Sequence, residues 1–174
     1  MIRSKPINVV EYDPAWPVLF AQIAERVRAA FVGGSLTRIE HVGSTSVPGL
    51  SAKPVIDIDV VIPSRADLPE AITRLMTLGY AHQGDLGVTS REAFRSPPDA
   101  LPQNLYVCAE DSPELRRHLV FRDYLRAHSD DARHYADLKH KLAEQFSDNR
   151  EAYTDGKSDF IQAVLDTHYY ATKP

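Results

Sequence analysis

The chain has 174 residues, of which 43% are hydrophobic and 25% are charged, and its formal net charge is −4. These values are typical of one ordinary soluble domain, and the negative charge argues against a surface that coats nucleic acid. No apolar run reaches the roughly 18–20 residues of a membrane-spanning helix, and a single cysteine, Cys108, excludes an internal disulfide. We therefore expect a cytoplasmic protein with no membrane contact and no nucleic-acid partner.

The first elements are a short edge strand over 7–12 and a helix over about 14–31. Asp13 and Pro14 form a favourable N-cap and first-turn pair for this helix. Its apolar residues recur at intervals of three and four, which places them on one helix face. They are Trp16, Leu19, Phe20, Ile23, Val27 and Phe31.

Two strands follow, over 36–42 and 55–62, and the second carries two acids in a β-branched run. Successive side chains of a strand point to opposite faces, so Asp57 and Asp59 share one face, roughly 6.6 Å apart along the chain. On a partly desolvated surface such carboxylates repel each other, so that one takes up a proton or both bind a cation. Mg²⁺ or Mn²⁺ suits them, because carboxylates, waters and phosphates are its usual ligands, and two such ions can activate an attacking oxygen and stabilise a leaving one.

The turn between these strands offers groups that suit phosphate. Gly43 permits close backbone approach, and Ser44 provides a hydroxyl and an exposed N–H for anionic oxygens. Lys53 adds a compact positive charge beside the acidic strand. His41 precedes the turn, where it either orients the loop or contacts a phosphate, or makes a structural hydrogen bond to the backbone. The sequence contains neither a Walker P-loop nor a GxGxxG motif.

The middle of the chain alternates between helix and strand, and the end is helical. We predict a helix over 65–78, a weak strand over 80–88, strands over 90–95 and 104–108, and helices over 113–126, about 130–146 and about 150–170. The helical histidines have spacings of ten, six and six, which are not those of metal ligands, and no zinc site is expected. They are His118, His128, His134 and His140.

Each of the last three helices has one basic residue in line with its apolar stripe. These residues are Arg122, Lys139 and Lys157, at spacings of three, four or seven from apolar neighbours. A cation on an inward face either extends to water along its own stem or meets an anion. Three such cations beside a metal-phosphate site favour a set that faces a triphosphate, with Arg122 binding phosphate oxygens bidentately and the lysines acting as compact charges.

Gly43-Ser44 followed by Asp57-x-Asp59 resembles the GS…DxD signature of the nucleotidyltransferase superfamily, which has the polymerase-β-like fold. The longer string HVGSTSVPGL-x-AKP-x-IDI, with FRDYLRAHSDDARHYADLKHKLA and YTDGKSDFI, resembles the GrpB family (UPF0157) over nearly the whole chain. The resemblance implies this fold, and some members of the family are fused to dephospho-CoA kinase.

One metal ligand that the resemblance implies, a third carboxylate, has no matching residue in this sequence. Active polymerase-β-like enzymes often use a third carboxylate from a later strand, whereas the strand at 104–108 has no acid. Relatives have histidines around this strand, where the present chain has Asn104 and Tyr106. Asp85 and Glu92 are possible substitutes, although each is expected to be a solvated surface acid.

We therefore expect an α+β fold in a single domain over 1–174. A nucleotidyltransferase-like core over 1–110 would carry a small mixed sheet with packed helices, and a C-terminal helical layer over 111–174 would close over the cleft. The expected function is transfer of a nucleotidyl group from a nucleoside triphosphate to an acceptor, with Asp57 and Asp59 as metal-binding catalytic residues. The alternatives are a non-catalytic nucleotide-binding or folding module, for example for dephospho-CoA kinase, and a metal-dependent phosphate-ester hydrolase.

Overall fold

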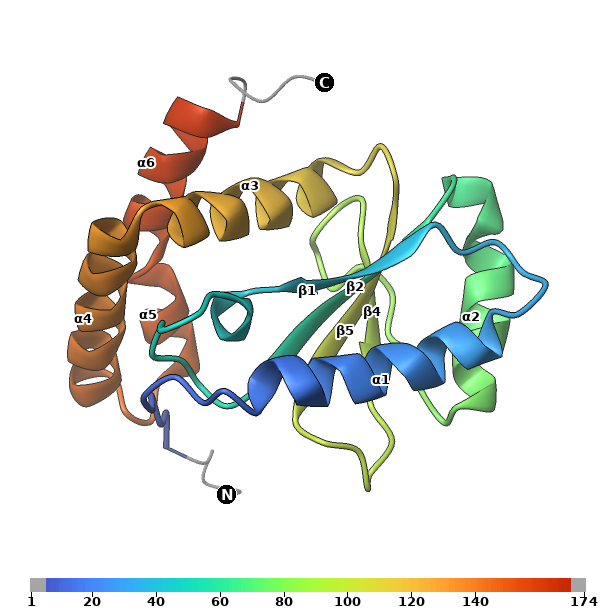
Figure 1. Ribbon diagram of the computed structural model, residues 1–174, viewed down its shortest axis with the longest axis horizontal. Coiled ribbons are helices and arrows are strands. Elements are labelled where there is room, and N and C mark those ends of the chain that lie inside the picture. Colours follow the sequence, from blue (N-terminus) through green and yellow to red (C-terminus); the bar gives the residue numbers. More distant parts are fainter. Residues whose placement is uncertain (1–5, 170–174) are drawn as a thin grey trace.

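A five-stranded sheet lies at the centre of the structure, a computed structural model that describes residues 6–169 (Figure 1). The strands are β1 (Arg38–Val42), β2 (Ile56–Ile62), β3 (Ala81–His82), β4 (Glu92–Arg95) and β5 (Gln103–Ala109). Their order in the sheet is β1-β2-β5-β4-β3. Only the pairing of β2 with β5 is parallel among these strands, and the other neighbours are antiparallel. The expected small mixed sheet is thus confirmed.

Helices cover both faces of this sheet and one of its ends (Figure 1). They are α1 (Trp16–Ala30), α2 (Leu68–Thr77), α3 (Pro113–Ala127), α4 (Ser129–Gln145), α5 (Arg150–Asp155) and α6 (Ser158–His168), with short 3-10 helices η1 (Ser44–Ser46) and η2 (Arg65–Asp67). Helices α1 and α2 pack on one face and α3 crosses the other, while α4, α5 and α6 stand beside the loop that connects β1 to β2.

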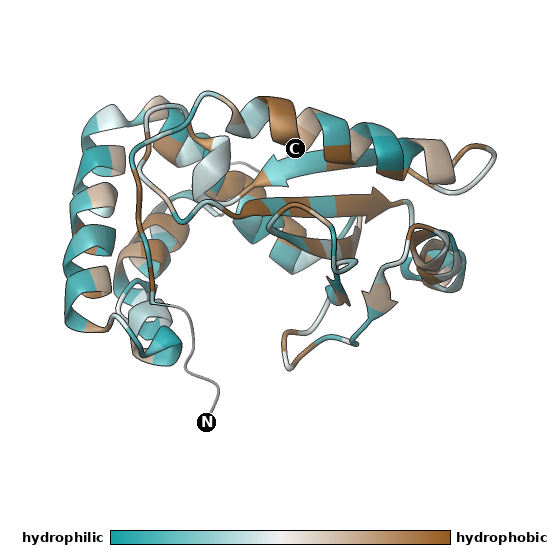
Figure 2. Ribbon diagram, turned by 90° about the horizontal axis from the view of Figure 1, so that it is seen from below, coloured by the Kyte–Doolittle hydropathy of each residue, from teal (hydrophilic) through white to brown (hydrophobic). Residues whose placement is uncertain are grey.

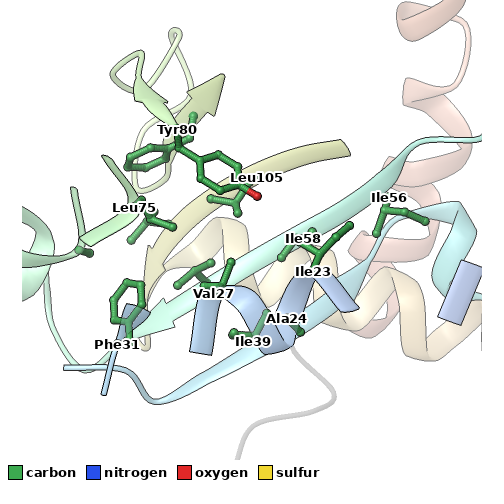
Figure 3. Packing of buried hydrophobic residues seen from close by; sticks show 14 of the residues in the cluster. Ile23, Ala24, Val27, Phe31, Ile39, Ile56, Ile58, Leu75, Tyr80 and Leu105 are labelled. Atoms are coloured by element: carbon green, nitrogen blue, oxygen red, sulfur yellow. The ribbon is translucent and has the colours of Figure 1, made fainter. Parts of the chain in front are cut away.

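The main core lies between β2, β5 and helix α1. Ile23 and Val27 of α1 point toward Ile58 of β2 and Leu105 of β5, and all four side chains are buried (Figure 3). The central strands are accordingly coloured as hydrophobic over most of their length, whereas the helices alternate between hydrophilic and hydrophobic residues (Figure 2). Among residues 6–169, no helix has the length and apolar character needed to cross a membrane.

Three expected elements differ from the structure. The expected edge strand over 7–12 is reduced to a single bridge between Val10 and Ala52, and the weak strand over 80–88 is reduced to β3. The expected last helix is divided into α5 and α6. Gly156 lies at the break, where an added Cβ would be 2.5 Å from the end of the Leu142 side chain of α4, so a larger residue there would force that side chain to shift.

Candidate functional site

The two faces of β2 have opposite characters. Ile56, Ile58 and Val60 point into the core, whereas the two acids lie on the face that α3 crosses. The register pairs Asp57 with Val42 and Asn104, and it pairs Asp59 with Glu40 and Tyr106. Paired residues of neighbouring strands point to the same side of a sheet. We call this polar set the acid face; its members are Glu40, Asp57, Asp59, Asn104 and Tyr106.

Asp57 is half-buried and lies against the turn that follows β1. Its Oδ1 accepts a hydrogen bond of 2.8 Å from the Asn104 side chain. Its Oδ2 lies where a side chain at Gly43 would be, because a Cβ added to that glycine would be 2.2 Å away. Burial raises the pKa of Asp57, although the Asn104 hydrogen bond and the charges of His118 and Lys53 oppose this shift. The turn and the acidic strand therefore meet at this carboxylate.

Replacing Gly43 by alanine is expected to be far more harmful than the same change at Gly49. Both glycines have positive φ, +69° and +78° respectively, but an added Cβ at Gly49 meets nothing within 4 Å. The backbone strain should lower the free energy of unfolding by about 1–2 kcal/mol for Gly49→Ala and by at least as much for Gly43→Ala, because the φ of 69° and ψ of −174° at Gly43 lie in a region that is essentially confined to glycine. Gly43→Ala should lose a further 1–3 kcal/mol because it displaces the Asp57 carboxylate. Urea unfolding of both variants measures the difference, and equal losses would contradict the close contact.

Asp59 is fully buried and already has a hydrogen-bonding partner on α3. Its Oδ2 lies 2.7 Å from Nδ1 of His118 on α3, whereas its Oδ1 has no hydrogen-bond partner among the described residues. Burial alone would lower the pKa of His118, but the hydrogen bond and charge of Asp59 outweigh this effect and raise it. His118 is a site residue that the sequence patterns did not indicate. Its position three residues after Leu115 and four before Arg122, on one helix face, was the available signal.

A cluster of three lysines stands at the Asp57 end of the acid face. Lys53 lies in the loop before β2, Lys139 on α4, and Lys157 at the start of α6. The ammonium groups of Lys53 and Lys157 lie 5.1 and 4.6 Å from the ring centroid of Tyr153. That of Lys139 lies 4.8 Å from the ring of Tyr135. Residues far apart in the sequence thus form one site, which we call the lysine cluster.

The lysine cluster is held in surroundings that disfavour its charge. The side chain of Lys139 is buried, in a residue only 2% exposed, and its Nζ donates a hydrogen bond to the carbonyl oxygen of Ser51. Burial and the charge of Lys157 lower the pKa of Lys139 to about 7, and burial and Lys53 lower that of Lys157 to about 8. The charge of Asp57 opposes both shifts. An anion bound here would offset the remaining repulsion among the lysines.

Arg122 has partners other than the lysine cluster. Its guanidinium contacts Glu40 and Asp123, at 2.7 Å each, and donates to the carbonyl oxygen of His41 at 3.1 Å. Only 11% of its side chain is exposed. Arg122 lies on an inward helix face, as its spacing predicts, and the anion that it meets in the structure is Glu40. Arg122 therefore fastens α3 to β1, and its predicted contact with phosphate stays a prediction.

His41 lies on the core side of β1, away from the acid face. Its ring stacks on Phe20 of α1 at 4.6 Å between centroids, and its Nε2 is 3.0 Å from the Thr45 hydroxyl of η1. Burial, with the charges of Arg126 and Arg122, lowers its pKa to about 4. This placement corresponds to the loop-orienting alternative. Ser44 begins η1 and is half-buried, beside Gly43.

Neither acid considered as a third ligand reaches the acid face. Glu92 was expected at the surface, but it is buried and lies on the opposite face of the sheet, paired with Arg65 at 2.9 Å and His82 at 2.8 Å. Asp85 is exposed in the loop before β4. Over residues 6–169, no three His, Cys, Asp or Glu side chains are grouped as a metal site. The oxygens of Asp57 fit a single Mg²⁺ that also binds phosphates and waters, since one carboxylate suffices for such an ion.

A separate groove lies between α3 and the end of α6, with a volume of about 830 Å³. Arg38, Arg116, Tyr124 and His168 are among the residues that line it. None of the predicted site residues does so. Although this groove is large, the lysine cluster lies near Asp57 and not in the groove, so the candidate site remains at Asp57.

Comparison with known proteins decides the family. The profile of the GrpB protein family matches residues 6–167. The chain belongs to this family. A UPF0157 protein of Pseudomonas aeruginosa is 42% identical over 169 residues, which cover 96% of this chain and 69% of the relative. A protein of Mycolicibacterium paratuberculosis named dephospho-CoA kinase is 27% identical over 177 residues, which cover 87% of this chain and 43% of that protein.

Solved structures place this GrpB protein in a wider fold group. The conserved protein GrpB from Enterococcus faecalis has a TM-score of 0.83 and 30% identity, over 94% of this chain and 98% of that one. A structure of Cid1 in complex with its short product ApU has a TM-score of 0.55 and 10% identity, over 78% of this chain and 43% of that one. The nucleotidyltransferase-like fold is thereby confirmed, and at such low identity the second likeness concerns the fold alone.

Proposed function

We propose that this GrpB protein binds a nucleoside triphosphate together with Mg²⁺ or Mn²⁺ and transfers its nucleotidyl group to an acceptor hydroxyl or amine. One observation supports this proposal above the others. Asp57, a half-buried carboxylate, lies between the Gly43 turn and the lysine cluster, on a nucleotidyltransferase-like fold. A carboxylate beside several lysines suits a ligand that brings both a cation and phosphates.

Each group of the site would have one task in this reaction. Asp57 would hold the cation, which supplies charge stabilisation between carboxylate and phosphate oxygens. The backbone N–H groups at Gly43 and Ser44 would bind phosphate oxygens, while the lysine cluster would offset their negative charge. The acceptor oxygen or nitrogen would attack the α-phosphorus, the bond to the leaving pyrophosphate would break, and the proton of the acceptor would pass to water. Catalysis would come mainly from positioning and charge stabilisation.

Transfer of a labelled nucleotide tests this function. The protein is incubated with each α-labelled nucleoside triphosphate, Mg²⁺ or Mn²⁺ and a cell extract that contains acceptors. Label should appear in an acceptor with the wild type and not with an Asp57→Asn, Asp59→Asn double variant. Labelled monophosphate released into water, with no labelled acceptor, would instead indicate a phosphate-ester hydrolase.

A non-catalytic module is the second candidate, and the surroundings of Asp59 favour it. This acid is engaged by His118, and the acid face has no third carboxylate free of a cation, because Glu40 is bound by Arg38 and Arg122. Such a module would bind the nucleotide and its metal ion without forming a product, or it would assist a partner protein. Dephospho-CoA kinase is the proposed partner, and its co-purification with this GrpB protein, lost on substituting the lysine cluster, would support this candidate.

Nucleotide binding is expected to take up protons near pH 8. The unliganded lysine cluster is partly neutral there, because the pKa of Lys139 is about 7 and that of Lys157 about 8. A bound polyphosphate favours the charged amines and raises both pKa values, so affinity should fall as the pH rises from about 7 to 9. Calorimetric titration in two buffers that differ in ionisation enthalpy measures the protons taken up. Binding without proton uptake would contradict a role for these lysines.

A further inference from the structure

The two acids of β2 differ in their direct partners. Asp57 is half-buried and accepts a hydrogen bond from a neutral amide, that of Asn104. Asp59 is completely buried, and one of its oxygens is bonded at 2.7 Å to a ring nitrogen of His118. A buried carboxylate requires a partner in contact with it, and His118 of α3 contacts Asp59, whereas the charge of His118 acts on Asp57 without such a contact. The pair therefore does not present two equivalent ligands.

The groups around Asp59 strengthen this asymmetry. Tyr106, its neighbour on β5, lies under the guanidinium of Arg91 at 4.2 Å from the ring centroid. Glu40, its neighbour on β1, contacts Arg38 at 2.9 Å and Arg122 at 2.7 Å. Glu40 and Asp59, the two acids at this end of the acid face, thus each have a basic side chain in contact. Tyr106 stands on β5, where a third carboxylate was expected, and its ring lies beneath Arg91. A divalent cation here would meet like charge.

We infer that His118 occupies the position at Asp59 that a second metal ion would take, so that the acid face accepts one divalent cation at Asp57. The part of this inference that places a cation at Asp57 rests on the proposed function. The part that pairs His118 with Asp59 is independent of that function. His118 is a positioning residue in this account. It engages the buried Asp59 carboxylate and fastens α3 to the sheet above the site.

Counting bound Mn²⁺ by electron paramagnetic resonance tests the inference. With a non-hydrolysable nucleoside triphosphate, the wild type should bind one Mn²⁺ more than the wild type binds without nucleotide. His118→Ala should gain a further Mn²⁺, because both oxygens of Asp59 become available, and His118→Ala with Asp59→Asn should lose it again. His134→Ala, at an exposed histidine of α4, is the matched control and should bind as the wild type does. Two Mn²⁺ in the wild type, or no gain in His118→Ala, would overturn the inference.

Thermal unfolding without nucleotide separates this inference from the proposed function. His118→Ala leaves the buried Asp59 carboxylate unpaired, so the melting temperature of this variant should be lower than that of the wild type. Mn²⁺ should restore the melting temperature of His118→Ala, but not that of the double variant His118→Ala, Asp59→Asn. His118→Gln, which keeps a hydrogen-bond donor, is the substitute if the alanine variant does not fold. Restoration by Mn²⁺ in a protein that binds no nucleotide would uphold the pairing while the proposed function fails. Absence of restoration would overturn the inference that His118 takes the place of a metal ion at Asp59.

Discussion

Asp57→Asn is expected to lower the metal-dependent affinity for nucleotide, and any nucleotidyl transfer, by roughly 100-fold or more. The substitution keeps the shape of the side chain and a hydrogen-bonding group for Asn104, but it removes the negative charge that would hold the cation beside the lysine cluster. Calorimetric titration with each nucleoside triphosphate and Mg²⁺ measures the affinity, and label transfer measures the rate.

Asp137→Asn is the matched control, because this acid is exposed on α4 and undergoes the same change of charge. Its affinity and transfer rate should equal those of the wild type. If both variants bind and react as the wild type does, Asp57 is not a ligand of the cation and the mechanism proposed here is wrong, although the fold assignment would be unaffected.

Lys139→Met is expected to stabilise the fold near pH 7 while weakening nucleotide binding. Burial lowers the pKa of this lysine from its ordinary value of 10.5 to about 7. The unfolded chain therefore binds more protons between about pH 7 and 10.5, and the stability of the wild type rises with pH through this window. The penalty for burying the charge is fully present below pH 7, where it amounts to several kcal/mol at about 1.4 kcal/mol per pKa unit.

The net gain in Lys139→Met should be smaller than that penalty, about 2 kcal/mol, because the variant leaves the carbonyl oxygen of Ser51 without its donor. Urea unfolding at pH 7 and pH 10 measures the gain, which should shrink at the higher pH. Lys141→Met, at an exposed position of the same helix, is the control and should change stability little at either pH. A destabilised Lys139→Met at pH 7 would show that the buried amine serves the fold and not a ligand.

Local patterns were sufficient to predict much of the fold. The alternation of β2 predicted which of its residues enter the core, and the helical spacings of three, four and seven predicted inward positions for Arg122 and Lys139. These patterns depend only on the geometry of one element. The short apolar run at 7–12 shows their limit, because a strand forms only where a neighbour can pair with it, and there only the bridge of Val10 to Ala52 was available.

The partners of the inward side chains could not be predicted in the same way. His118 and Asp59 are 59 residues apart, and Arg122 and Glu40 are 82 apart, so their pairing depends on how α3 crosses the sheet. Spacing within a helix shows that a cation faces inward but not which anion it meets. For this reason the sequence pattern predicted that Arg122 acts together with the two helical lysines. In the structure Arg122 pairs with Glu40, and His118 pairs with Asp59.

A crystal structure with Mn²⁺ and a non-hydrolysable nucleoside triphosphate tests the central claim most directly, since anomalous scattering locates the ion. The account predicts Mn²⁺ about 2.0–2.2 Å from an oxygen of Asp57, with phosphate oxygens toward Lys53 and Lys157. Nucleotide bound in the groove between α3 and α6, with no ion at Asp57, would contradict it.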